Sequence, residues 1–176
     1  VIGGGDWAAN RIVPDCVRSW SEGKSVQIRN PLATRPWQHV LEPLSGYLLL
    51  ATKLYQRKEL HGEPFNFGPS TQQDHTVLEL VKAMSAYWDK VRWENVSDSA
   101  QKPYESSLLK LNCEKAQQNL NWQAVLTFKE TVRMTAEWYR SYYENPSSIG
   151  DVTLSHIKEF GNFSKKRVFN GSFELG

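Results

Sequence analysis

Two capping boxes constrain the fold of this chain more tightly than any other feature of its sequence. Thr76-Val-Leu-Glu79 and Thr127-Phe-Lys-Glu130 each place a hydroxyl three residues before a carboxylate. In that arrangement the two side chains satisfy amide donors that the first turn of a helix leaves without intrahelical partners. The pattern predicts one helix over residues 76–88 and another over residues 127–143.

Strand-like segments lie between further helical patterns. Apolar side chains recur at helical spacing over residues 11–22, where Pro14 falls in the first turn and Gly23 ends the helix. Residues 43–57 are apolar on most faces, which predicts a well-buried helix. A helical turn is expected near Glu114–Leu120, and strands at Val26–Ile28, Glu63–Phe67, Val91–Glu94 and Leu108–Leu111. The sequence therefore predicts an α/β fold with helices in the majority.

The size and composition of the chain are those of one soluble domain. Its 176 residues are 40% hydrophobic, enough to bury a core, and its net charge of +2 argues against a nucleic-acid surface. The longest apolar run, Leu48–Ala51, is far shorter than the roughly 20 residues of a membrane span. Cys16 and Cys113 have no CxxC spacing, so neither a metal site nor a disulfide framework is indicated. We expect a cytoplasmic protein with no nucleic-acid or membrane partner.

The first and last segments of the chain each lead to a separate prediction. The opening Val1–Gly5 has neither an initiator Met nor the layout of a signal peptide, so we expect a piece of a longer protein. The glycines of this segment do not form GxGxxG, which favours a turn into the helix at Arg11 over a dinucleotide-binding loop. Residues 1–160 form the predicted domain, and residues 161–176 show little periodicity and are expected to be a disordered tail.

The loop over residues 29–40 holds the strongest candidates for a binding function. Arg29 and Arg35 supply two guanidiniums on a proline-braced segment, and guanidiniums suit bidentate contact with phosphates. The alternative is a surface loop whose arginines pair with carboxylates and whose Trp37 packs in the core. His39 has no partner at metal-ligand spacing, which favours a structural hydrogen bond over catalysis.

Seven segments of the sequence match the pattern of a known family: Val1–Ala8, Arg11–Pro14, Ile28–Pro31, Arg35–Ala51, Phe65–Pro69, Leu109–Ala116 and Leu120–Trp122. Together they resemble the CDP-glucose 4,6-dehydratase family of extended short-chain dehydrogenases. The likeness covers residues 1–160 and implies that the chain is the C-terminal, substrate-binding part of that fold, without its N-terminal Rossmann core.

The resemblance implies an internal redox elimination on a sugar nucleotide. In this reaction NAD accepts hydride from C4, the C5 proton is removed, water leaves from C6, and hydride returns to C6. CDP-glucose becomes CDP-4-keto-6-deoxyglucose, a precursor of deoxysugars in bacterial surface polysaccharides. NAD and the catalytic residues would belong mainly to the N-terminal half, so the resemblance implies that this fragment alone is inactive. The parent is expected to be a homo-oligomer.

By resemblance, this chain would bind the nucleotide and diphosphate of the substrate. Arg35 would contact the diphosphate, and Asn10, Arg11 and Ile12 would lie near the base and ribose. The remaining predicted contacts are Arg29, Asn30 and Asn66, the last of these on a strand formed by residues 65–67 that would flank the pocket. Ser107 stands where the family usually has a His, which puts contacts there in question.

Two other functions stay open at this point. The chain could be a non-enzymatic binding module that keeps the fold, or it could belong to an epimerase or reductase on the same scaffold. For a fragment that lacks the Rossmann half, helices 11–22 and 43–57 would also expose apolar surface, and we expect self-association when the piece is made alone.

Overall fold

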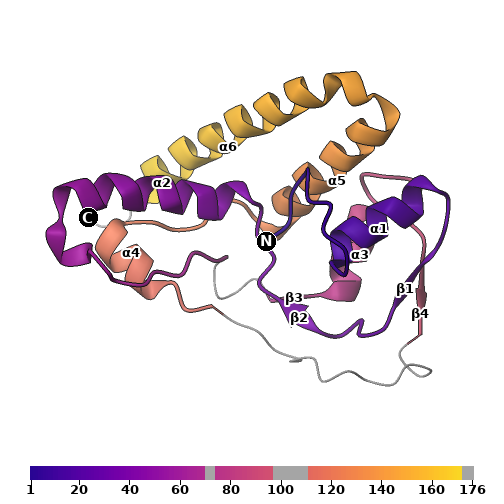
Figure 1. Ribbon diagram of the computed structural model, residues 1–176, viewed down its shortest axis with the longest axis horizontal. Coiled ribbons are helices and arrows are strands. Elements are labelled where there is room, and N and C mark those ends of the chain that lie inside the picture. Colours follow the sequence, from indigo (N-terminus) through magenta and orange to yellow (C-terminus); the bar gives the residue numbers. More distant parts are fainter. Residues whose placement is uncertain (70–73, 97–110, 172–176) are drawn as a thin grey trace.

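The computed structural model describes residues 1–69, 74–96 and 111–171 (Figure 1). Its α-helices are α1 (Ile12–Ser21), α2 (Leu41–Gln56), α3 (Val77–Met84), α4 (Glu114–Leu120), α5 (Phe128–Glu144) and α6 (Ile149–Gly171). Two short 3-10 helices are η1 (Lys58–Leu60) and η2 (Pro146–Ser148). The strands are β1 (Val26–Ile28), β2 (Thr34–Arg35), β3 (His75–Thr76) and β4 (Trp93–Asn95). Helices are in the majority, which confirms the predicted fold class. No helix in these ranges is long and apolar enough to cross a bilayer.

Both capping boxes form as the sequence predicts. The Glu79 amide donates to the Thr76 hydroxyl at 3.1 Å, and the Thr76 amide donates to the Glu79 carboxylate at 2.6 Å. The same reciprocal pair forms between Thr127 and Glu130 at the start of α5. These bonds fix where α3 and α5 begin, while α3 ends before residue 88 in a series of tight turns.

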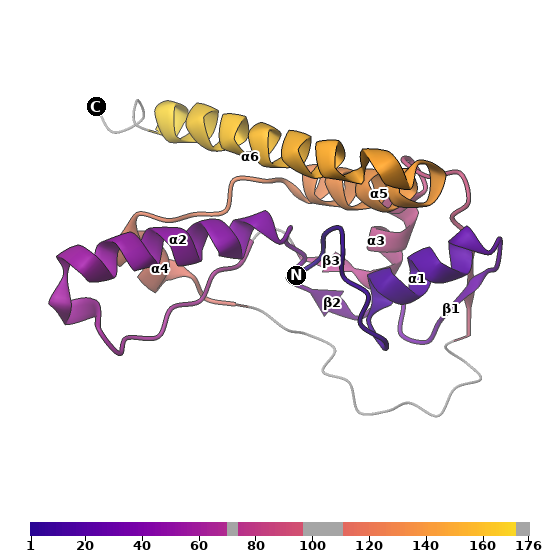
Figure 2. The same cartoon turned by 45° about the horizontal axis from the view of Figure 1, so that its top comes forward.

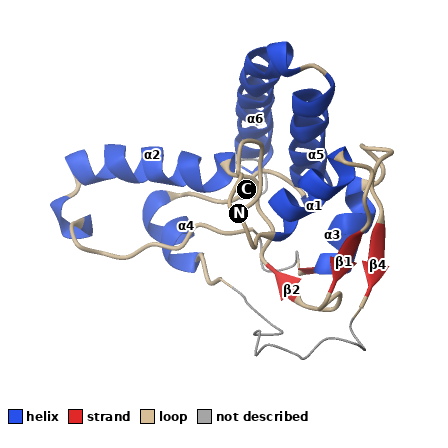
Figure 3. Cartoon of the chain, turned by 45° about the vertical axis from the view of Figure 1, so that its right-hand side comes forward, coloured by secondary structure: helices blue, strands red, loops and turns tan. Residues whose placement is uncertain are grey.

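The strands form two small sheets; β1 and β4 lie side by side at the lower right of Figure 3, with β2 to their left. β1 pairs in parallel with β4, and β2 pairs in antiparallel with β3, so that Arg35 lies opposite His75. A separate parallel bridge joins Ile2 to His39. Through these pairings, segments from the start of the chain, from residues 34–39 and from residues 75–76 are brought together.

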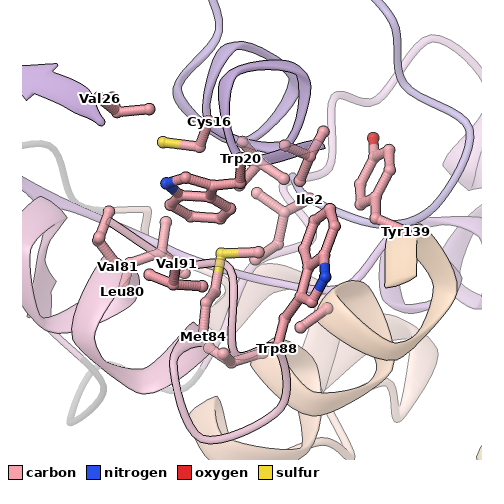
Figure 4. Packing of buried hydrophobic residues seen from close by; sticks show 14 of the residues in the cluster. Ile2, Cys16, Trp20, Val26, Leu80, Val81, Met84, Trp88, Val91 and Tyr139 are labelled. Atoms are coloured by element: carbon pink, nitrogen blue, oxygen red, sulfur yellow. The ribbon is translucent and has the colours of Figure 1, made fainter. Parts of the chain in front are cut away.

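The main core lies between α1, α3 and α5 (Figure 4). Trp20 of α1 is fully buried, and its indole N–H donates to the Arg92 carbonyl at 2.8 Å. Its ring meets Trp88 edge to face, with ring centroids 6.1 Å apart. The apolar face of α1 is thus packed against other described elements. The expectation that this helix would expose apolar surface is wrong.

α2 and α4 extend from this core as a separate arm, which is visible at the left of Figure 1. Leu60, Phe67, Ala116, Leu120 and Trp122 form the buried cluster of the arm. The buried Glu42 carboxylate accepts hydrogen bonds from the amides of Val125 and Leu126 at 2.9 and 2.6 Å. This carboxylate therefore ties the start of α2 to the segment that leads into α5.

α6 corrects the expectation of a disordered tail over residues 161–171. The helix runs antiparallel to α5 and continues to Gly171 (Figure 2). Phe160 and Phe163 pack against Val125, Leu126 and Met134, which explains why the helix extends past residue 160. Residues 172–176 lie outside the described ranges.

Two predicted strands also differ from the structure. Residues 63–67 form no strand, because their backbone does not pair with another described strand. The Phe67 carbonyl instead accepts a hydrogen bond from the Gln38 side chain at 2.7 Å. Asn66 therefore does not lie on a pocket-flanking strand. Most of the predicted strand at residues 108–111, and Ser107, lie outside the described residues.

The prediction that α2 is well buried is wrong. Leu44, Tyr47, Leu48 and Tyr55 recur at helical spacing and have exposed fractions of 44%, 58%, 72% and 94%. The opposite face carries Leu50 and other leucines that pack on the cluster of the arm. A helix with apolar side chains all round fits between two surfaces, and the structure provides one of them.

This exposed stripe predicts self-association of the chain made alone. Replacing Leu48 and Tyr55 together by glutamine removes the two most exposed apolar side chains of α2, so the scattering mass should fall toward that of a monomer. Leu32→Gln is the control, because Leu32 is 75% exposed but lies outside α2. A monomeric wild-type chain at all concentrations in light scattering would contradict the prediction.

Candidate functional site

A cavity of about 500 Å³ lies where the first residues of the chain, the start of α1 and β2 meet. It is lined by Val1, Ile2, Gly3, Asp6, Arg11, Ile12, Val13, Pro14, Arg35, Pro36, Trp37 and Tyr139. Most of these side chains are apolar, and the charged ones are two guanidiniums and one carboxylate. A largely apolar cavity with a few charged groups is the usual form of a small-molecule site.

The loop that precedes α1 is held in place by the aromatic face of α5. A Cβ atom on Gly4 would lie 2.0 Å from Cδ2 of Trp138, so only glycine fits against that ring. Trp7 meets Tyr139 edge to face at 5.4 Å. The Tyr139 hydroxyl donates to the Asp6 carbonyl at 2.7 Å. The glycine turn thus packs against protein, which agrees with the sequence-based preference for a turn over a dinucleotide-binding loop.

Arg11 and Asp6 form an ion pair at the cavity. The Arg11 Nη1 lies 3.1 Å from the Asp6 Oδ2, and the Ala8 amide donates to the other carboxylate oxygen at 3.0 Å. The side chains of Arg11 and Asp6 keep exposed fractions of 62% and 28%. The carboxylate is therefore oriented by two partners and still accessible.

Two further features make the cavity positive: the Arg35 guanidinium and the first turn of α1. Arg35 is placed by β2, and its Nη1 donates to the Thr34 carbonyl at 2.8 Å. The first turn of α1 also lines the cavity, and its N-cap residue Arg11 provides no side-chain cap within the described residues. The dipole of a helix favours anions near its N-terminus, although Pro14 provides no amide donor in this turn. The arrangement suits a phosphate or diphosphate group.

The structure brings together some of the predicted site residues. Arg35, Arg11 and Ile12 all line the one cavity. The others lie elsewhere: Asn10 precedes α1 in a left-handed conformation, Arg29 and Asn30 follow β1, and the Asn66 amide donates to the Asn112 carbonyl at 3.2 Å. The sequence predicts a turn before Arg11 but does not point to Asp6 or Tyr139, because neither belongs to a local motif.

His39 is buried and acts as a structural group. It receives a hydrogen bond from the Leu41 amide at its Nδ1, 3.3 Å away. Burial, with a smaller contribution from His156, lowers the pKa of His39 from 6.5 to about 4. His156 faces Glu137 at 3.7 Å, beside the Arg133 guanidinium. A neutral His39 agrees with the hydrogen-bonding role predicted for it.

The two cysteines are free thiols, and Cys16 is buried. Burial, together with the nearby Asp15, raises the pKa of Cys16 to about 12, which makes this thiol a poor nucleophile. Among the described residues, no group of three or more His, Cys, Asp or Glu side chains could hold a metal ion.

Comparison with known proteins gives this site a family context. No protein-family model matches the chain. The chain is 42% identical over 143 residues to CDP-glucose 4,6-dehydratase from Salmonella typhimurium, an alignment that covers 81% of this chain and 39% of that enzyme. The chain is a relative of CDP-glucose 4,6-dehydratase. The resemblance predicted from its sequence is thereby confirmed, and the chain spans about two fifths of the length of this relative.

Solved structures confirm the fold. dTDP-glucose 4,6-dehydratase from Bacillus anthracis, solved with NAD, matches 82% of this chain and 44% of its own at a TM-score of 0.58 and 19% identity. UDP-glucose 4-epimerase from Bifidobacterium longum, solved with NAD+ and UDP, matches 81% of this chain and 42% of its own at 0.57 and 19%. The chain has the fold of the C-terminal part of extended short-chain dehydratases and epimerases.

The close packing of Gly4 predicts that the cavity is sensitive to a single methyl group. Gly4→Ala should lower the melting temperature, because the Trp138 ring must move and the loop that carries Asp6 must move with it. Gly150→Ala is the control, since a Cβ at that helical position would have no described atom within 4 Å apart from its chain neighbours and the backbone of its own helix. Equal melting temperatures for the two variants would contradict the packing.

The buried His39 predicts a loss of stability in mild acid. Its pKa in the folded chain is below the ordinary value, so protons bind more tightly to the unfolded chain. The stabilising contribution is complete above pH 6.5 and is lost progressively as the pH falls toward 4. His39→Gln should flatten this part of the curve of unfolding free energy against pH, measured by urea denaturation. An unchanged slope would show that His39 does not cause it.

Proposed function

We propose that this chain is the nucleotide-binding part of a CDP-glucose 4,6-dehydratase. The observation that carries the proposal is the single cavity that contains Arg35, Arg11 and the uncapped first turn of α1. A nucleoside diphosphate carries a dianionic group that needs neutralisation and a base and ribose that need a less polar surface. Both kinds of surface are present in this cavity, and the 42% identity to the Salmonella enzyme favours CDP-glucose over other sugar nucleotides.

The chain would contribute binding and positioning to the reaction. Contacts with the diphosphate hold the sugar at a fixed place, so binding energy made far from C4 can raise the rate of the chemical step. NAD, when bound, supplies the hydride acceptor and donor. The described residues do not fit this cofactor, because the glycine turn at residues 3–5 packs against Trp138. We therefore assign NAD and the acid–base residues to another part of the parent enzyme, which we propose to be a cytoplasmic homo-oligomer.

Asn10, Arg29, Asn30 and Asn66 remain proposed contacts outside the cavity wall. Each would need a substrate that extends beyond the lining residues. An epimerase on the same fold is the second candidate, since the Bifidobacterium structure matches the chain about as well as the dehydratase structure does.

The Arg35 guanidinium gives the most direct test. In the intact protein that contains this chain, Arg35→Ala should weaken CDP-glucose binding at least tenfold, or about 1.4 kcal/mol, because a charge-assisted contact to phosphate is lost. Titration calorimetry with CDP-glucose and dTDP-glucose measures the effect and the preference between the two bases.

Lys82→Ala serves as the matched control for net charge. Lys82 is exposed on α3 and does not line the cavity, so its replacement should leave the affinity unchanged. Equal affinities of Arg35→Ala and the wild type would overturn the proposed site. A third titration with UDP-glucose tests the alternative: tighter binding of UDP-glucose than of CDP-glucose by the wild type would favour the epimerase.

A further inference from the structure

Asp6 is the one carboxylate among the described residues that line the cavity. Its position is unexpected for a site that binds a diphosphate, because a carboxylate repels phosphate oxygens. The same side chain attracts hydrogen-bond donors, and an ionised carboxylate accepts without donating. The part of the ligand that faces Asp6 must therefore carry donors.

The Asp6 carboxylate is fixed before any ligand arrives. One oxygen is held by the Ala8 amide at 3.0 Å and the other by Arg11 at 3.1 Å. The Asp6 backbone is held by the Tyr139 hydroxyl at 2.7 Å. Each carboxylate oxygen has two lone pairs, so these two contacts leave capacity for further donors. A fixed acceptor recognises a ligand with little loss of conformational freedom.

Cytidine and uridine nucleotides differ in hydrogen bonding at two neighbouring ring positions: N3 is an acceptor in cytosine and carries a donor hydrogen in uracil, and the groups at C4 differ as well. Cytosine carries an amino group where uracil and thymine carry a carbonyl oxygen, and Asp and Glu side chains accept from that amino group. A carboxylate that faces the C4 position would attract the amino group of cytosine and repel the carbonyl oxygen of uracil. We infer that Asp6 determines the base preference of this site by accepting a hydrogen bond from the exocyclic amine of cytosine. The inference rests on the proposed function and deepens it.

Asp6→Asn tests this role with little change of shape. The Ala8 amide keeps the amide oxygen of Asn on its side, so the amide nitrogen takes the place of the oxygen that faces Arg11. A donor then stands where an acceptor stood. The measured quantity is the ratio of the dissociation constants for CDP and UDP in the intact protein. Because both values come from one sample, the ratio does not depend on the folded fraction.

The wild type should prefer CDP by at least about tenfold, and Asp6→Asn should bring the ratio close to one or reverse it. Arg35→Ala is the matched control: it removes the proposed contact with the diphosphate, which both nucleotides carry, so both should bind more weakly with the ratio unchanged. dCDP gives the third comparison, since it keeps the base and lacks the ribose 2′-hydroxyl.

Each other outcome overturns the inference. If Asp6→Asn weakens CDP and UDP equally, the carboxylate only holds Arg11. If the variant changes the CDP to dCDP ratio instead, Asp6 binds the ribose. A wild type that binds CDP and UDP equally well has a pocket without base preference. This result refutes the role of Asp6 but does not contradict the proposed diphosphate site. A wild type that binds neither nucleotide refutes the proposed function itself.

Discussion

The hydrogen bond from the Tyr139 hydroxyl to the Asp6 carbonyl joins residues 133 positions apart, and the cavity depends on it. The first loop of the chain has no regular structure of its own, so it takes its shape from α5. Gly4 under Trp138 and the edge-to-face contact of Trp7 with Tyr139 hold the same loop. α5 thus contributes Tyr139 to the main core, and the same residue, together with Trp138, supports the loop at the site.

Part of the positive charge in the cavity is offset before a ligand binds. Asp6 offsets Arg11 through an ion pair whose partners are both partly exposed, and such pairs contribute little to stability. Its value is therefore in orientation, because the pair sets the direction of both side chains. Arg35 reaches the cavity from the separate β2–β3 sheet, so the two guanidiniums approach from different elements.

The sequence pattern of α2 predicts more burial than the described chain provides. Its apolar residues are spread over most of the helix surface, which predicts burial on every side. The arm covers one side through Leu60, Phe67 and Trp122, while the stripe that includes Leu48 and Tyr55 stays exposed. Hydrophobic periodicity records which faces are apolar; it does not record whether the covering surface is part of the same chain.

The family resemblance predicts Arg35 and Arg11 as binding residues, and both line the cavity. The sequence by itself determined the local structure: the starts of α3 and α5 through their capping boxes, and α1 with its end at Gly23. These features depend on neighbours a few residues apart, so a linear pattern contains them. Tertiary structure decided the rest. The continuation of α6 depends on Phe160 and Phe163 reaching Met134, and the roles of Asp6 and Tyr139 depend on contacts between opposite ends of the chain. Contacts over such separations leave no periodic signal in the sequence, because the two residues that touch have different sequence neighbours.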